Sequence, residues 1–179
     1  IEHALRAEDF ERAAKLVEGR AETLWGRGEQ IRLRGWLEAL PAEQVTSRPQ
    51  LCIFQAWGLF ASGQQRAAEQ SLQAAERVLD RTVGRETDAA PAKRVHMPVS
   101  DMTKIQGRAA AVRAFMASFR GDVSDIIQYS RQALERLPEQ DLVWRSSAAI
   151  ALGDAYSFSG EMIGARRARS EALEESEAA

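Results

Sequence analysis

Apolar residues recur every three or four positions along most of the chain, which is the spacing of one face of an α-helix. Pro41 and Pro49 mark where one helix stops and where another begins. The apolar pattern predicts a helix in the first residues and further helices at about 10–24, 29–40, 49–62, 64–81, 101–120, 122–137, 141–159 and 161–176, with Asp101 as an N-terminal cap.

Glycines fall where the first helix of each predicted pair should end. Gly63, Gly121 and Gly160 occupy these places, and glycine readily adopts the left-handed conformation that stops a helix. The last two are 39 residues apart, whereas the first two are 58 apart. The difference equals the length of the segment 82–100, so an inserted loop in an otherwise regular array explains the spacing.

The stretch 146–175 indicates how two such helices pack. Gly153 and Ala165 are small enough for a close antiparallel approach, and Leu152 and Tyr156 fill the seam one turn apart. This pattern resembles a tetratricopeptide (TPR) unit, which buries its apolar face only against further units. We therefore expect an all-α fold in which antiparallel helix pairs stack as a TPR-like right-handed superhelix. Small residues match between two pairs when their glycines are aligned: Ala68 and Ala75 with Ala165 and Ala172.

The helices are expected to form a single domain over residues 1–179, with the loop insertion at 82–100. This segment has two prolines and little periodicity, and it is longer than a normal connection between repeats. Two interpretations stay open. It is either a solvated, partly disordered linker or a flap over a binding surface, with Lys93, Arg94 and His96 as polar contacts.

The charge and the hydropathy exclude two classes of partner. A net charge of -2 gives no basic field that would hold a nucleic-acid backbone, so we expect no nucleic acid on this segment. No apolar run approaches the roughly 20 residues that a membrane helix requires, and no signal-peptide pattern opens the chain. We expect a chain that binds no membrane and lies in the cytoplasm.

Residues that carry catalytic or metal chemistry are scarce. Cys52 is the single cysteine and lies in an apolar run, which is typical of a buried structural thiol. His3 and His96 are the only histidines and lack metal-ligand spacing, and the loop G-x-x-x-x-G-K-[ST] is absent. We therefore expect no enzyme, with no catalytic residue, cofactor or metal in this segment.

Three motifs in the first 80 residues carry a family resemblance. They are HALRAEDFERAAKLVE at 3–18, WLEALP at 36–41 and SRPQLCIFQAW at 47–57. In this order they resemble the helical repeat region of MalT-like regulators, which are large ATP-dependent bacterial transcription activators with a LuxR-type DNA-binding end. The remaining residues resemble the family only as generic helical repeats. Glu8 stands where the family often has glycine, which leaves the geometry of that turn open.

The resemblance implies a function in signal sensing. The partners would be a small-molecule inducer or a regulatory protein, together with other domains of the parent chain. ATP is then expected only in a nucleotide-binding domain of the parent. The first predicted helix has no capping residue before it, so we expect this chain to be a fragment of a longer protein. The alternative is a TPR protein-interaction scaffold or adaptor that has no connection with transcription.

A ligand or partner would lie along the first helix of each pair, as the TPR resemblance implies. When the glycines are aligned, residues of these helices recur at three or four positions on one side. The alternative for the aromatic residues is core packing, which we also expect for Trp25 and Trp36. The candidate groove residues are Gln50, Ile53, Trp57, Phe60, Arg108, Phe115, Phe119, Asp154 and Phe158.

Overall fold

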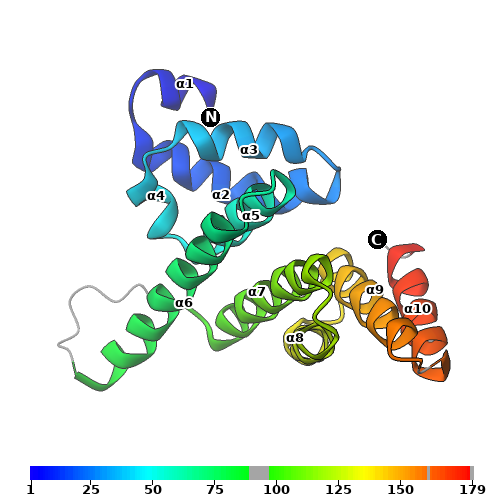
Figure 1. Cartoon of the computed structure of the whole chain (residues 1–179). Helices are drawn as coiled ribbons and strands as arrows, with labels where there is room; N and C mark the ends of the chain where they lie inside the picture. The colour runs from blue at the N-terminus through cyan, green and yellow to red at the C-terminus, as the bar shows by residue number, and fades with distance from the viewer. Residues whose placement is uncertain (89–96, 161, 178–179) are drawn as a thin grey trace. The chain divides into compact units, whose positions relative to one another are not determined.

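The structure is a computed structural model that describes residues 1–88, 97–160 and 162–177 (Figure 1). Over these residues every regular element is a helix and no strand occurs, so the expected all-α fold is confirmed. The chain divides into two compact units, an N-terminal unit of residues 1–97 and a C-terminal unit of residues 98–179. One continuous superhelix over residues 1–179 stays a prediction.

The N-terminal unit is built from antiparallel helix pairs. α2 and α3 lie side by side, and α5 packs along α6 (Figure 1). The apolar positions predicted from the helical spacing form its core, with Val17, Leu33, Leu51 and Leu72 all buried. Its helices are α1 (Glu2–Arg6), α2 (Phe10–Gly26), α3 (Gln30–Ala39), α4 (Ala42–Thr46), α5 (Pro49–Ala61) and α6 (Gln65–Asp88).

The short helix α4 was not predicted. It lies between Pro41 and Pro49, in a stretch too short to show helical periodicity. Val45 is fully buried, and its carbonyl accepts a hydrogen bond from the Cys52 thiol at 3.3 Å. The connection from α3 to α5 is therefore a packed part of the core, and α4 contacts α2, α5 and α6.

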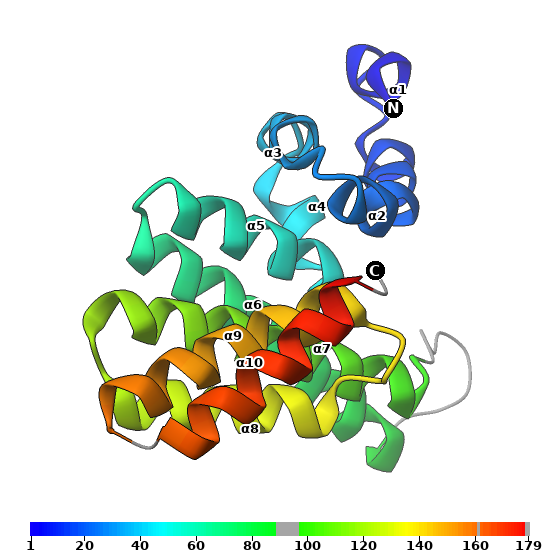
Figure 2. The same ribbon diagram turned by 90° about the vertical axis from the view of Figure 1, so that its right-hand side faces the viewer.

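In residues 98–160 and 162–177 of the C-terminal unit, four helices follow one another up and down. α8 packs against both α7 and α9, α9 packs along α10, and α7 also contacts α9 (Figure 2). Small side chains make these close approaches possible: Ala114, Ala117, Ala151 and Ala155 surround Ile126 in the core. Its helices are α7 (Val99–Arg120), α8 (Val123–Arg136), α9 (Leu142–Phe158) and α10 (Met162–Glu177).

The expected loop at 82–100 is shorter than the sequence suggests. α6 continues to Asp88, because no proline interrupts it before Pro91, and α7 already begins at Val99. The cap of α7 is Pro98 rather than Asp101, which lies in the first turn. Residues 89–96 lie outside the described residues, and with them the linker and flap hypotheses for Lys93, Arg94 and His96.

Left-handed backbone at a helix end recurs five times in the described residues. The glycines predicted to stop the first helices all show it, with φ of +77° at Gly63, +71° at Gly121 and +81° at Gly160, and Gly28 shows it at +72°. The fifth residue is Glu8, with φ of +55°. The position where the resembled family often has glycine therefore keeps the glycine conformation with a larger side chain.

The turn at Glu8 is completed by backbone hydrogen bonds. The Glu8 N–H donates to the Leu5 carbonyl at 3.2 Å, and the Asp9 N–H donates to the Ala4 carbonyl at 3.0 Å. This pair of bonds is the Schellman motif, which satisfies carbonyls at the end of α1. Asp9 then caps α2, because its carboxylate accepts a hydrogen bond from the Arg12 N–H at 3.2 Å.

Gly107 is required by a close approach within the C-terminal unit. A Cβ atom at this position of α7 would lie 2.9 Å from Cγ of Leu137 and 3.1 Å from its backbone nitrogen. Leu137 is itself buried at the end of α8, so it has little room to move aside. Gly107 thus lets α7 pack against the α8 to α9 connection.

We expect Glu8→Gly to raise the free energy of unfolding by about 0.5–1 kcal/mol. The left-handed conformation costs a non-glycine residue about 1–2 kcal/mol, and the added chain entropy of glycine offsets part of this gain. Gly63→Ala, in the same conformation, should change stability in the opposite direction. Urea denaturation measures both variants, and a loss of stability in Glu8→Gly would mean that the Glu8 side chain supports the turn.

We expect Gly107→Ala to lower the free energy of unfolding by about 1–3 kcal/mol, because the added methyl group overlaps Leu137. The matched control is Gly35→Ala in α3, where a Cβ atom would meet no atom within 4 Å. That control should gain about 0.5–1 kcal/mol from helix propensity. Thermal and urea denaturation measure both variants. An equal gain in the free energy of unfolding for both would show that α7 and Leu137 are not tightly packed at Gly107.

Candidate functional site

The candidate groove residues of α5 differ in how exposed they are. Ile53 and Phe60 are buried, so neither can line an open groove, and this part of the expectation is corrected. α5 packs against α3 and α4 as well as α6, and this covers positions that would be open in an isolated helix pair. Trp57 and Gln50 are half-buried and remain partly accessible.

Trp57 belongs to a cluster of aromatic rings. Its ring lies edge-on to Trp25, with centroids 5.4 Å apart, and 6.2 Å from Phe60. Trp25 also contacts Phe54 at 5.5 Å. Such pairs contribute about 0.5–1.5 kcal/mol each beyond their buried area. The core interpretation offered for these aromatics therefore holds for Trp25 and Phe60, and in part for Trp57.

An aromatic pocket of about 140 Å³ opens between α3 and α5 beside this cluster. Trp25, Phe54 and Trp57 are among its lining residues, and Ile31 and Arg34 of α3 line it as well. Ile31 is 82% exposed, which is unusual for a large apolar side chain. Ile31 lies two residues before the buried Leu33, which puts it on the opposite side of α3.

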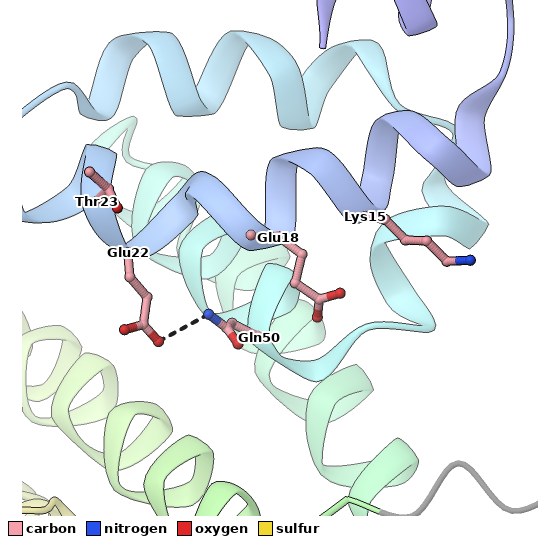
Figure 3. Close-up of a pocket in the computed structure, with 6 residues that line it drawn as sticks. Lys15, Glu18, Glu22, Thr23 and Gln50 are labelled. Atoms are coloured by element: carbon pink, nitrogen blue, oxygen red, sulfur yellow. Dashed lines mark hydrogen bonds between the residues drawn. The ribbon is translucent and has the colours of Figure 1, made fainter.

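Gln50 lies in a different place, a shallow polar hollow of about 600 Å³ along α2. Figure 3 shows its amide pointing to Glu22, whose carboxylate accepts a hydrogen bond from Gln50 Nε2 at 3.1 Å. Glu18 and Lys15 also line this hollow. Burial raises the pKa of Glu18, and Arg48, 3.8 Å away, partly opposes that rise. The hollow and the aromatic pocket share no lining residue.

Cys52 is fully buried in α5, as predicted for a structural thiol. Burial raises the pKa of its thiol to about 12. A thiol with that pKa stays protonated at neutral pH and is a poor nucleophile or metal ligand.

Arg108 has a structural role in place of the expected groove contact. Its guanidinium donates two hydrogen bonds to Asp141, at 2.8 and 3.1 Å, and its side chain is only 4% exposed. The same group lies 5.6 Å from the ring centre of Trp144, which is buried. This contact could not be predicted from local sequence patterns, because Asp141 lies 33 residues away on another element.

The remaining candidates of the C-terminal unit are more accessible. Phe119 and Phe158 are each 74% exposed and stand two residues before the glycines that end α7 and α9. Phe115 is half-buried. Asp154 is half-exposed and accepts a hydrogen bond from Arg169 at 3.2 Å. Phe119 and Phe158 are therefore accessible at the surface, whereas their place in a binding groove stays a prediction.

Neither a metal-binding cluster nor a membrane-spanning helix occurs in the part of the chain that the structure describes. No group of three or more His, Cys, Asp or Glu side chains there could hold a metal ion. None of the helices in the same part of the chain has an apolar stretch of the length that a bilayer requires.

The C-terminal part of the chain is similar to a known protein family. A family model described as the MalT-like TPR region matches residues 107–179, from within α7 to the end of the chain. The C-terminal unit contains a TPR-like helical region. The match lies outside residues 1–80, where the three motifs of the sequence resemblance are found. No curated protein and no solved structure matches the chain.

The ion pair inside the TPR-like region yields a prediction about stability. We expect Arg108→Met to lower the free energy of unfolding by about 3–5 kcal/mol, because it leaves the buried Asp141 carboxylate without its charge partner. Adding Asp141→Leu should restore much of this loss, because the double variant buries no charge.

The matched control for this prediction is Arg167→Gln, which breaks an exposed pair with Glu171. It should change the free energy of unfolding by less than about 1 kcal/mol. Urea denaturation measures all three variants. A cost as small for Arg108→Met as for the control would show that Arg108 contributes little to packing.

Proposed function

We propose that this chain is the signal-receiving helical repeat segment of a MalT-like transcription regulator. The observation that carries the proposal is the match of residues 107–179 to the MalT-like TPR region. The motifs at 3–18, 36–41 and 47–57 support it independently from the other end of the chain. A small-molecule inducer or a regulatory protein would bind the repeats, and an ATPase and a DNA-binding domain elsewhere in the parent would respond in the cytoplasm.

The packing of the C-terminal unit suits a segment that transmits a conformational change when a ligand binds. Each helix there contacts its neighbours in order, and α7 also contacts α9. A ligand that bridges two such helices favours one spacing between them, and stacked repeats carry a change of spacing to the next repeat. We assign the segment a binding role and no catalysis, and we assign ATP and DNA to other domains.

The exposed aromatic residues are the best candidates for the contact with the signal. Phe119 and Phe158 end two helices that pack against each other, and Asp154 lies one turn before Phe158 on α9. Large apolar side chains at the surface next to a carboxylate suit a ligand with one apolar face and several polar groups.

A protein-interaction scaffold outside transcription is the second candidate function. The aromatic pocket favours it, because about 140 Å³ is well below the roughly 300–1,000 Å³ of typical small-molecule sites. A pocket of this size suits a single side chain of a protein partner.

We expect thermal unfolding to detect the inducer in a panel of sugars, nucleotides and small metabolites. A ligand at a hundred times its dissociation constant adds about 2.7 kcal/mol, or roughly 5–10 °C for a chain of this length. Asp154→Ala and Phe158→Ser should each abolish the shift, whereas Arg167→Gln, which breaks an exposed pair on α10, should keep it. Trp57→Ala tests whether the N-terminal unit takes part.

The parent gene provides the decisive counter-test of the regulator assignment. If it encodes neither a nucleotide-binding loop upstream nor a helix-turn-helix downstream, the regulator function is wrong. A panel without any shift, combined with such a gene, would leave the scaffold as the better function.

A further inference from the structure

We propose that the aromatic pocket of the N-terminal unit binds a peptide segment of a partner protein. One bulky aliphatic side chain of the peptide would enter the pocket, and an acidic residue next to it would pair with Arg34. Like the scaffold function, this inference requires a protein partner, and it rests on the proposed function in that respect alone. It holds whether or not the parent is a transcription regulator.

The size and the walls of the pocket decide the kind of group that fits. About 140 Å³ holds one leucine- or isoleucine-sized side chain and is too small for a sugar or a nucleotide. Trp25, Phe54 and Trp57 provide aromatic surface, which favours an apolar group. Burial of a leucine or isoleucine side chain in the pocket contributes favourable free energy of binding, whereas a polar side chain of similar size lacks this contribution.

Ile31 extends the apolar surface from the pocket to the solvent. It is 82% exposed at the start of α3, although Leu33 and Leu37 on the same helix are almost fully buried. Because it is exposed, the Ile31 side chain does not contribute to the core. It lines a pocket that has aromatic walls. A partner that covers the pocket would also cover Ile31, so the pocket and its rim form one continuous apolar contact.

The charge at the rim selects the flanking residue of the peptide. Arg34 is the charged residue among those that line the pocket. The stem of Arg34 lies along α5 beside Gly58, where its Cγ would be in ordinary van der Waals contact, 3.6 Å, with a Cβ atom. Arg34 Nη1 donates a hydrogen bond to Ser62 Oγ at 3.3 Å. This hydrogen bond to the C-cap of α5 places the guanidinium beside the pocket that Arg34 lines.

The existing ion pair of Arg34 leaves its charge available. Arg34 Nε lies 3.5 Å from Glu38, and both side chains are about half exposed or more. Exposed pairs of this kind contribute only about 0–1 kcal/mol, so a carboxylate of the partner can share the guanidinium at low cost. A planar guanidinium accommodates a second carboxylate through its other N–H groups.

The test uses the full 179-residue chain and a synthetic heptapeptide that has leucine between two aspartates, with serine and glycine at its ends. Titration is followed by the ¹H–¹⁵N signals of the four tryptophan indoles. We expect saturable shifts of the Trp25 and Trp57 signals, while that of Trp144, buried in the C-terminal unit, stays in place. Alanine for leucine in the peptide should weaken binding about tenfold, and lysines for the aspartates about fivefold or more.

Variants of the chain test the location. Ala61→Phe fills the pocket from an exposed position at the end of α5 and should abolish the shifts without unfolding the unit. Ala39→Phe, also exposed at a helix end but outside the pocket, is its matched control and should bind as the parent chain does. Arg34→Gln should weaken binding of the aspartate peptide several-fold and leave that of a neutral serine version unchanged.

Several results would overturn the proposal. They are the absence of a saturable shift up to millimolar peptide, equal binding to Ala61→Phe, and tighter binding of the lysine peptide. Indole shifts that follow the protein concentration without peptide would assign the pocket to a second copy of the chain instead. Each of these results leaves the thermal-shift panel and the parent-gene test unaffected, so the failure of this inference is distinct from the failure of the regulator function.

Discussion

The left-handed residue at the end of a helix is the constraint on which the helix pairs depend. An antiparallel pair forms only if the first helix ends abruptly and its last carbonyls still find donors. Gly28, Gly63, Gly121 and Gly160 meet this condition without strain, because glycine lacks a Cβ atom. Glu8 meets it with a side chain, so the turn at Glu8 stores strain that the following cap by Asp9 helps to offset.

Once the turns fix the pairs, small residues set how closely the helices approach. Alanines fill the seams of the C-terminal unit, and Gly107 leaves room for Leu137. Close approach leaves little space for a charged group, yet Arg108 is buried there because Asp141 and Trp144 surround its guanidinium. The packing therefore accommodates the buried cation of Arg108 because a carboxylate and an aromatic ring lie next to it.

The sequence predicted most helices and the glycine turns because both are local properties of the chain. It missed α4 because a five-residue helix between two prolines shows no periodicity. The candidate site was predicted less well. Position relative to a glycine selected Phe119 and Phe158, which are exposed, but it also selected Ile53 and Phe60, which neighbouring helices cover. The partner of Arg108 could not be inferred, because the fold alone brings residues 33 positions apart together.

The two units present different chemistry for recognition, and this difference bears on what each can bind. The aromatic pocket of the N-terminal unit is small and is lined by Arg34, whose guanidinium is hydrogen-bonded to Ser62, so a partner bound there would be selected by shape and charge together. Phe119 and Phe158 of the TPR-like region project from helix ends, so their surface favours extended apolar contact with little shape selection. Specificity for a single residue of a partner would therefore lie in the pocket, because its limited volume admits one side chain and Arg34 favours an acidic neighbour.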